Sequence, residues 1–71
     1  MNKTSNRKTI DTTRAAALLI GGAQLCSADG TYTVNFYSDL FCVGRRGRKR
    51  VRPMGIDEFL REFRGCSWRR S

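Results

Sequence analysis

The residues with the clearest capacity for chemistry are six cations in the segment from Gly44 to Pro53, GRRGRKRVRP. They are Arg45, Arg46, Arg48, Lys49, Arg50 and Arg52. Arginine predominates, and its planar guanidinium can meet two phosphate oxygens at once. The two glycines of the segment allow a tight turn close to a nucleic-acid backbone. The segment therefore predicts a phosphate-binding hairpin, and the alternative is a nuclear-import signal or a solvated basic run.

The charge of the whole chain is concentrated around this segment. The 71 residues include 14 basic and 6 acidic side chains, for a net charge of +8. Residues 45–71 hold ten basic and three acidic residues (+7), residues 15–44 hold two acidic residues and no basic one (−2), and residues 1–14 hold four basic and one acidic (+3). Such asymmetry is typical of a polyanion binder. It favours a nucleic acid over a membrane or a protein partner.

Other kinds of site find little support in the residue types. The sequence has no histidine, and its acidic residues are scattered apart from Asp57-Glu58. Cys26, Cys42 and Cys66 form no CxxC pair, so a tetrahedral zinc site is not expected. We therefore expect no catalytic residue, no cofactor and no metal site, and a protein that is not an enzyme. Three cysteines without a disulfide pattern suggest reduced thiols in a cytoplasmic protein, two of them in the core.

A single small domain must position the basic segment. Residues 1–9 have the composition of a disordered basic arm, residues 10–65 form the predicted domain, and residues 66–71 form a short basic tail. The apolar run at 15–23 is too short to span a membrane, and the region before it is long and acid-containing for a signal peptide. We read that run as part of the domain.

The domain begins with a helix and continues with strands. Thr12 or Thr13 can cap a helix that continues to Ile20 and ends at Gly21-Gly22, and residues 23–28 could form a second helical turn. Residues 31–37 alternate polar and apolar, as in a half-buried strand. Ser38-Asp39 can turn the chain into a strand at 40–44. A third strand near 49–52 would end at Pro53.

An amphipathic helix at 56–64 is the clearest element. Ile56, Phe59, Leu60 and Phe63 follow helical spacing on one face. We expect this face to pack on the apolar face of strand 31–37, which carries Tyr32, Val34 and Phe36. In a chain this small these aromatic residues are needed in the core, although Tyr32, Phe36 and Tyr37 could instead stack on bases.

The chain resembles the small winged helix-turn-helix proteins of the excisionase and MerR-like group. The opening from Thr12 to Leu19, the wing-like run from Val43 to Pro53 and the sequence Ile56-Asp57-Glu58-Phe59-Leu60 carry the likeness, which is close only over residues 43–63. It implies a winged-helix-like α+β domain with a basic β-hairpin wing and a C-terminal amphipathic helix. The alternative is a three-stranded antiparallel sheet packed on one helix, similar to the arm-site DNA-binding domains of tyrosine recombinases.

Either resemblance implies an accessory or regulatory protein of a mobile element or phage that binds double-stranded DNA and acts in DNA recombination or transcription regulation. One copy offers a small footprint, so we expect a monomer that binds DNA with further copies of itself or with a recombinase. A different class stays open: a small phage- or plasmid-type protein that binds and inhibits a host protein or nucleoprotein complex.

Overall fold

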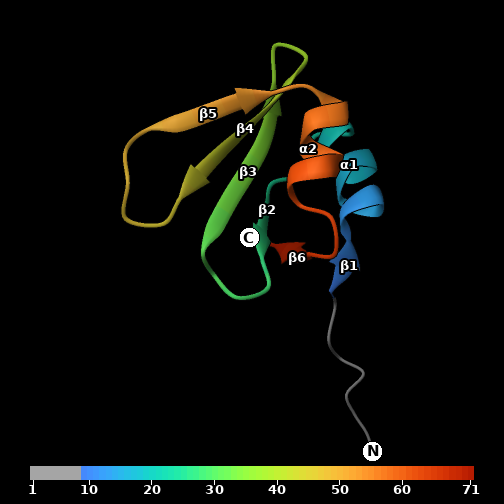
Figure 1. Ribbon diagram of the computed structural model, residues 1–71, viewed down its shortest axis with the longest axis horizontal. Coiled ribbons are helices and arrows are strands. Elements are labelled where there is room, and N and C mark those ends of the chain that lie inside the picture. The colour runs from blue at the N-terminus through green and yellow to red at the C-terminus, as the bar shows by residue number, and fades with distance from the viewer. Residues whose placement is uncertain (1–8) are drawn as a thin grey trace, which may run out of the picture.

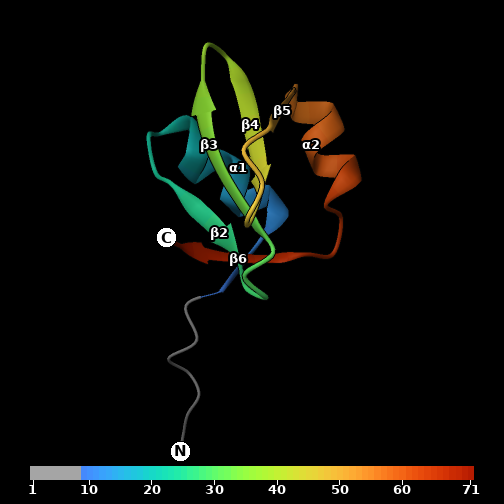
Figure 2. The same cartoon turned by 90° about the vertical axis from the view of Figure 1, so that its left-hand side faces the viewer.

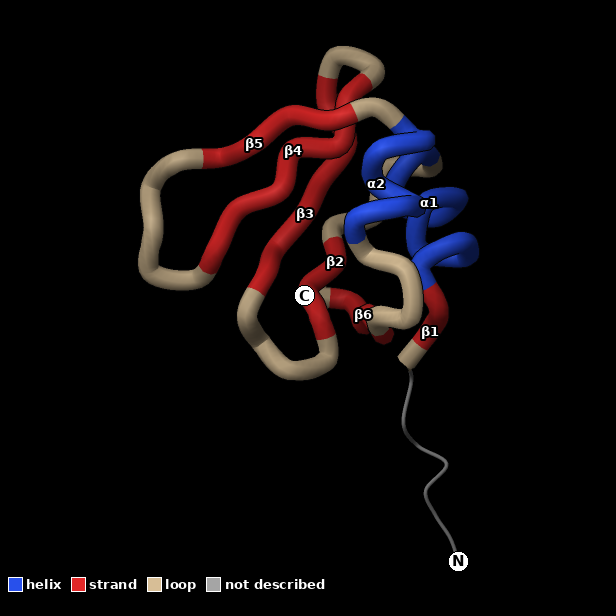
Figure 3. The backbone as a smooth tube through the Cα atoms, viewed as in Figure 1, coloured by secondary structure: helices blue, strands red, loops and turns tan. Residues whose placement is uncertain are grey.

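The computed structural model describes residues 9–71, which form two helices and six strands of an α+β domain (Figures 1 and 3). The predicted arm at residues 1–9 lies outside the described residues except for Thr9. The elements are β1 (Ile10–Asp11), α1 (Thr12–Ile20), β2 (Leu25–Ser27), β3 (Tyr32–Tyr37), β4 (Leu40–Arg45), β5 (Val51–Met54), α2 (Ile56–Glu62) and β6 (Ser67–Arg70). The predicted α+β class is confirmed.

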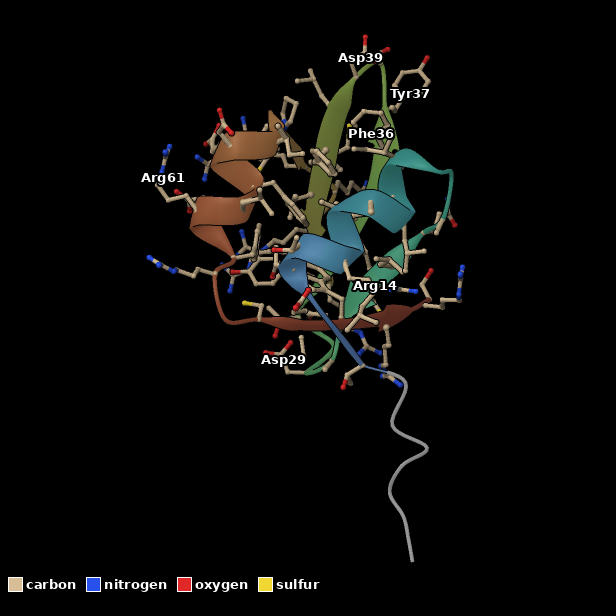
Figure 4. The ribbon with its side chains drawn as sticks, turned by 90° about the vertical axis from the view of Figure 1, so that its right-hand side faces the viewer. Arg14, Asp29, Phe36, Tyr37, Asp39 and Arg61 are labelled. Carbon is tan, nitrogen blue, oxygen red and sulfur yellow. The ribbon has the colours of Figure 1, made fainter. Side chains whose placement is uncertain are left out.

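All six strands belong to one antiparallel sheet in the order β1-β6-β2-β3-β4-β5. Both helices cover one face of this sheet, and the other face is open (Figures 2 and 4). Strands β3, β4 and β5 lie side by side, as in the alternative outline of a three-stranded sheet with one helix, and α2 packs on β4. They are part of a larger sheet, however, and α1 adds a second helix.

The sheet-dominated topology fits a winged helix poorly. Residues 23–28, expected to form a helical turn, contain strand β2 instead, which pairs with β3 on one side and β6 on the other. The segment 23–30 therefore supplies no recognition helix. A short apolar stretch is compatible with either a helix or a strand. Here the segment is a strand because β2 pairs with a neighbouring strand on each side.

The C-terminal residues 66–71, expected as a short basic tail, contain strand β6 in the interior of the sheet. The indole of Trp68 is fully buried, and its Nε1 donates to Oγ1 of Thr12 at 3.0 Å. The same Thr12 hydroxyl donates to the carbonyl oxygen of Phe63 at 2.7 Å. One buried threonine thus links the start of α1 to the end of α2 and to β6.

The first helix is capped differently from the prediction. Asp11, rather than Thr12 or Thr13, is the N-cap, and its carboxylate accepts from the backbone N–H of Arg14 at 2.8 Å. Thr12 is instead the first residue of α1, and its buried hydroxyl donates to the carbonyl of Phe63 rather than capping the helix. The helix ends at Gly21 as expected, and Gly22 has a positive φ of 106°.

The core is an aromatic cluster between α2 and the sheet. The ring of Phe59 stacks on Phe41 at 4.6 Å and contacts Phe63 and Trp68 at 5.4 and 5.6 Å. Tyr32, which is half-buried, meets Phe63 edge-on at 5.1 Å. Of the predicted packing of α2 on β3, the contact of Phe63 with Tyr32 is confirmed. Phe59 packs on Phe41 of β4 instead, and Ile56 is 44% exposed. Ile56 is the first residue of a seven-residue helix and lies at its end, beyond the core.

The hairpin between β3 and β4 turns through the two residues predicted. Tyr37 pairs with Leu40, so that Ser38 and Asp39 form a two-residue loop, with φ of 53° and 64°. Two positive φ values are the signature of a type I′ turn, whose twist matches the flanking strands. Figure 4 shows Tyr37 and Asp39 at this turn, far from Asp29 at the opposite end of β3.

Candidate nucleic-acid interface

Strands β4 and β5 present the basic segment as an ordered hairpin. Gly44 pairs with Val51 and Val43 with Arg52, and residues 46–50 form the connecting loop. Gly47 has a φ of 83°, which favours glycine, and the N–H of Arg48 donates to the carbonyl of Arg45 at 2.9 Å. The loop projects from the body of the domain on the side away from the helices (Figure 1). We call Gly44–Pro53 the basic hairpin.

Pro53 was expected to end the strand pattern, and this expectation is wrong. It lies inside β5, opposite Cys42. Strand β5 is at the edge of the sheet, where a residue without an N–H can be accommodated without loss of a ladder hydrogen bond. The hairpin therefore continues to Met54, whose side chain is buried in the core.

A groove of about 790 Å³ runs along the basic hairpin, and we call it the hairpin groove. Its lining consists of Tyr32, Val43, Arg45, Arg48, Lys49, Arg50, Val51, Arg52, Pro53, Met54, Glu62 and Phe63. Five of the six predicted site residues thus line one concave surface. Arg46 is the exception. The guanidinium of Arg46 lies over the turn between β2 and β3 instead. Its Nη1 is so close to Gly30 that a Cβ at this position would come within 3.2 Å of it.

The groove also has an aromatic component, which comes from the side of the core. Phe63 and the half-buried Tyr32 line it from α2's C-terminal end and from β3. The guanidinium carbon of Arg45 lies 5.9 Å from the centre of the Tyr32 ring. This is within the range of a cation–π contact, which orients Arg45 while leaving it exposed.

Helix α2 contributes the acidic groups near the hairpin. Nη2 of Arg52 donates to Oε2 of Glu58 at 2.7 Å, and the two side chains are 62% and 35% exposed. Glu62, one turn further along the helix, lines the groove. The charge of Arg52 is therefore partly neutralised, whereas the other four groove cations form no ion pair with a carboxylate of the described residues.

The open face of β3, β4 and β5 is a poor alternative for phosphate binding, and the register places one cation, Arg69 of β6, on the rest of that face. Alternation along β3, β4 and β5, read from the buried residues and the strand register, identifies the residues on that face. They are Thr33, Asn35, Tyr37, Leu40, Cys42, Gly44, Val51 and Pro53, and all are uncharged. The basic side chains of these strands lie on the side of the groove.

Sequence reasoning found the cations of the interface but not its other members. Phe63 was assigned to the core, and it does pack there while lining the groove. Glu62 gave no signal, because a single glutamate on an exposed helix face is ordinary. The three cysteines are free and half-buried, and none belongs to the buried core, so the expectation that two of them lie in the core is wrong. Among residues 9–71 there is no group of three or more His, Cys, Asp or Glu side chains that could hold a metal ion.

The described helices are all too short or too polar to cross a membrane. Comparison with known proteins gave no matching family model, no similar curated protein and no similar solved structure.

Proposed function

We propose that this protein binds DNA through the basic hairpin, which grips the phosphate backbone as the wing of an excisionase-like protein would. The observation that carries the proposal is the convergence of five hairpin cations on one groove. A solubilising charge run has no reason to line a concave surface, whereas a backbone binder needs several cations within reach of consecutive phosphates.

The order of the hairpin supports tight binding. Arg45 and Arg52 project from paired strands, and the loop between them is short and hydrogen-bonded to Arg45. Arginines held in this way lose less conformational entropy on binding than those of a free tail. If about four of the groove cations each neutralise a phosphate, log K falls with log salt with a slope of roughly −3.5.

In this proposal the hairpin, rather than a recognition helix, makes the DNA contacts. Residues 23–30 supply a strand and a turn where a helix-turn-helix protein would place its second helix. The proposed role is accordingly that of an accessory or regulatory protein with modest sequence preference, acting with a recombinase or with further copies of itself. Sequence readout would then come from the few hairpin side chains that reach base edges.

The test is a pair of double variants that remove the same charge. Arg48→Ala with Arg50→Ala removes two exposed groove cations, and Arg61→Ala with Arg64→Ala removes two exposed cations outside the groove lining. Figure 4 shows Arg61 pointing away from the body of α2. We expect the groove variant to bind duplex DNA at least about tenfold more weakly at 0.1 M salt and to lower the salt slope by about two.

The control variant should change the slope by less than one, and emission of the buried Trp68 verifies folding in both. Equal losses in the two variants, or no nucleic-acid binding by the wild-type chain at low salt, would overturn the proposal. The second outcome, together with a stable complex with a host protein, would favour the inhibitor class instead.

A further inference from the structure

The two walls of the hairpin groove are chemically unlike. The hairpin wall carries five cations, whereas Glu62 stands on the wall formed by α2, and Tyr32 and Phe63 supply aromatic surface. A site for phosphates alone gains nothing from an aromatic surface and is weakened by a carboxylate. The combination matches a ligand that is anionic on one side and has an aromatic, hydrogen-bond-donating group on the other.

A nucleotide with an unpaired base has these properties. In a continuous duplex the base faces are stacked inside the helix, so only phosphates, sugars and groove edges can reach a protein. In a single strand the base face is available to stack on an aromatic side chain, with cations along the backbone. A groove of about 790 Å³ falls within the range of sites that hold small organic ligands.

We infer that the hairpin groove holds an unpaired base of single-stranded DNA, or of a locally opened duplex, stacked against Tyr32. The guanidinium of Arg45 lies over the Tyr32 ring, with its carbon 5.9 Å from the ring centre, so it leaves this face to the base and contacts a flanking phosphate. The carboxylate of Glu62 accepts a hydrogen bond from an exocyclic amino group. The site therefore prefers cytosine, which offers the N4 amino group, over thymine, which offers a carbonyl oxygen there. This inference rests on the proposed function and specifies its ligand.

The preference for unpaired bases is measured by extrapolation to high salt. Counterion release dominates the affinity of a basic protein for any polyanion, but its contribution to the binding free energy vanishes at 1 M salt. The contribution of base stacking persists there. Anisotropy titrations with oligo-dC, oligo-dT and a duplex of equal length, each at several salt concentrations, give the residual affinity at 1 M. We expect it to be about tenfold higher for oligo-dC than for the duplex. A residual affinity for the duplex equal to or above that for oligo-dC overturns the inference.

Two tyrosines on the same strand provide the matched stacking test. Tyr32→Leu removes the groove ring, and Tyr37→Leu removes a ring that is 70% exposed on the open face of the sheet. We expect the first to lower the residual oligo-dC affinity about tenfold and the second to leave it unchanged. Because Tyr32 also packs on Phe63, Tyr32→Phe serves as the folded reference and should retain the affinity. If Tyr32→Phe is folded and Tyr32→Leu and Tyr37→Leu behave alike, the stacking assignment is wrong.

Base preference is tested at Glu62. Glu62→Gln and Asp39→Asn each remove one negative charge, and Asp39 lies in the β3–β4 turn, outside the groove lining. Both should strengthen binding slightly to every oligonucleotide. Only Glu62→Gln should abolish the preference for oligo-dC over oligo-dT, which we expect to be about fivefold in the wild type. Loss of that preference in both variants, or its absence from the wild type, overturns the role of Glu62.

These outcomes separate this inference from the proposed function. If the duplex binds with the larger residual affinity and Arg48→Ala with Arg50→Ala weakens it, the hairpin is a duplex-binding element and the unpaired-base site is refuted alone. If no nucleic acid binds, both proposals fall together.

Discussion

Glu58 offers a perturbation that should increase DNA affinity rather than reduce it. Its carboxylate accepts from Arg52 at 2.7 Å, and Arg52 is the one groove cation with such a partner among the described residues. With 62% and 35% of the two side chains exposed, the pair contributes only about 0–1 kcal/mol to stability. Glu58→Gln should therefore fold normally and release Arg52 to bind a phosphate.

The size of the gain follows from the counterion-release slope. One additional phosphate contact makes the slope of log K against log salt steeper by about 0.9, and the gain vanishes at 1 M salt. At 0.1 M salt this corresponds to roughly eightfold tighter binding, as an upper value. Fluorescence anisotropy with a labelled duplex at four salt concentrations gives both the slope and the gain.

Asp57→Asn is the control, because it removes the same charge from the same turn of α2 and Asp57 does not line the groove. It should shift affinity only slightly and leave the slope within about 0.3 of the wild type. Equal gains in affinity in the two variants would mean that the change in net charge, and not the release of Arg52, strengthens binding. A loss of affinity in Glu58→Gln would mean that the ion pair positions the hairpin, and the account of Arg52 as a restrained phosphate contact would be wrong.

Four further outcomes are expected. Phe59→Ala should lower the free energy of unfolding by about 3–5 kcal/mol in urea titrations, whereas Ile56→Ala, on the same predicted face but 44% exposed, should cost under about 1 kcal/mol. Thr12→Val should cost about 1–3 kcal/mol, because Nε1 of Trp68 loses its acceptor; a cost no larger than that of Thr13→Val would contradict this role. The backbone N–H of Thr31 and the hydroxyl of Ser27 lower the pKa of Asp29. The ionised form then stabilises the fold above the ordinary carboxyl pKa, and this contribution disappears as the pH falls through the lowered value. Asp29→Asn should accordingly show a shallower loss of stability below about pH 4, and parallel curves would refute the linkage. Sedimentation velocity at micromolar concentration should show a monomer, and a tight dimer without DNA would contradict this expectation.

Local patterns determined much of the fold. The alternation of residues 31–37, the Ser38-Asp39 turn and the amphipathic spacing of Phe59 and Phe63 were each sufficient to predict their elements. The charge of the basic hairpin was equally plain, because six cations in ten residues are visible without any coordinates. In each case the signal lies within a few residues of the element that it describes.

Long-range pairing determined the elements that were predicted wrongly. Strand β2 has three residues and β6 has one buried side chain, so neither has a readable period. They become strands because each completes the backbone hydrogen bonds of the other, with Leu25 opposite Arg70 and Ser27 opposite Trp68. Trp68 is buried for the same reason, since the neighbouring strands and α2 enclose it.

The candidate site divides in the same way between sequence and tertiary structure. The sequence by itself determined which residues carry the positive charge, since side-chain chemistry does not depend on the fold. Only the tertiary structure decided that five of those cations share a groove with Tyr32, Phe63 and Glu62, while Arg46 lies apart. The physical reason is that the groove lies between whole elements, β3, the hairpin and α2. Their apposition depends on core packing, such as the burial of Phe59 against Phe41, and no pattern within a single element specifies it.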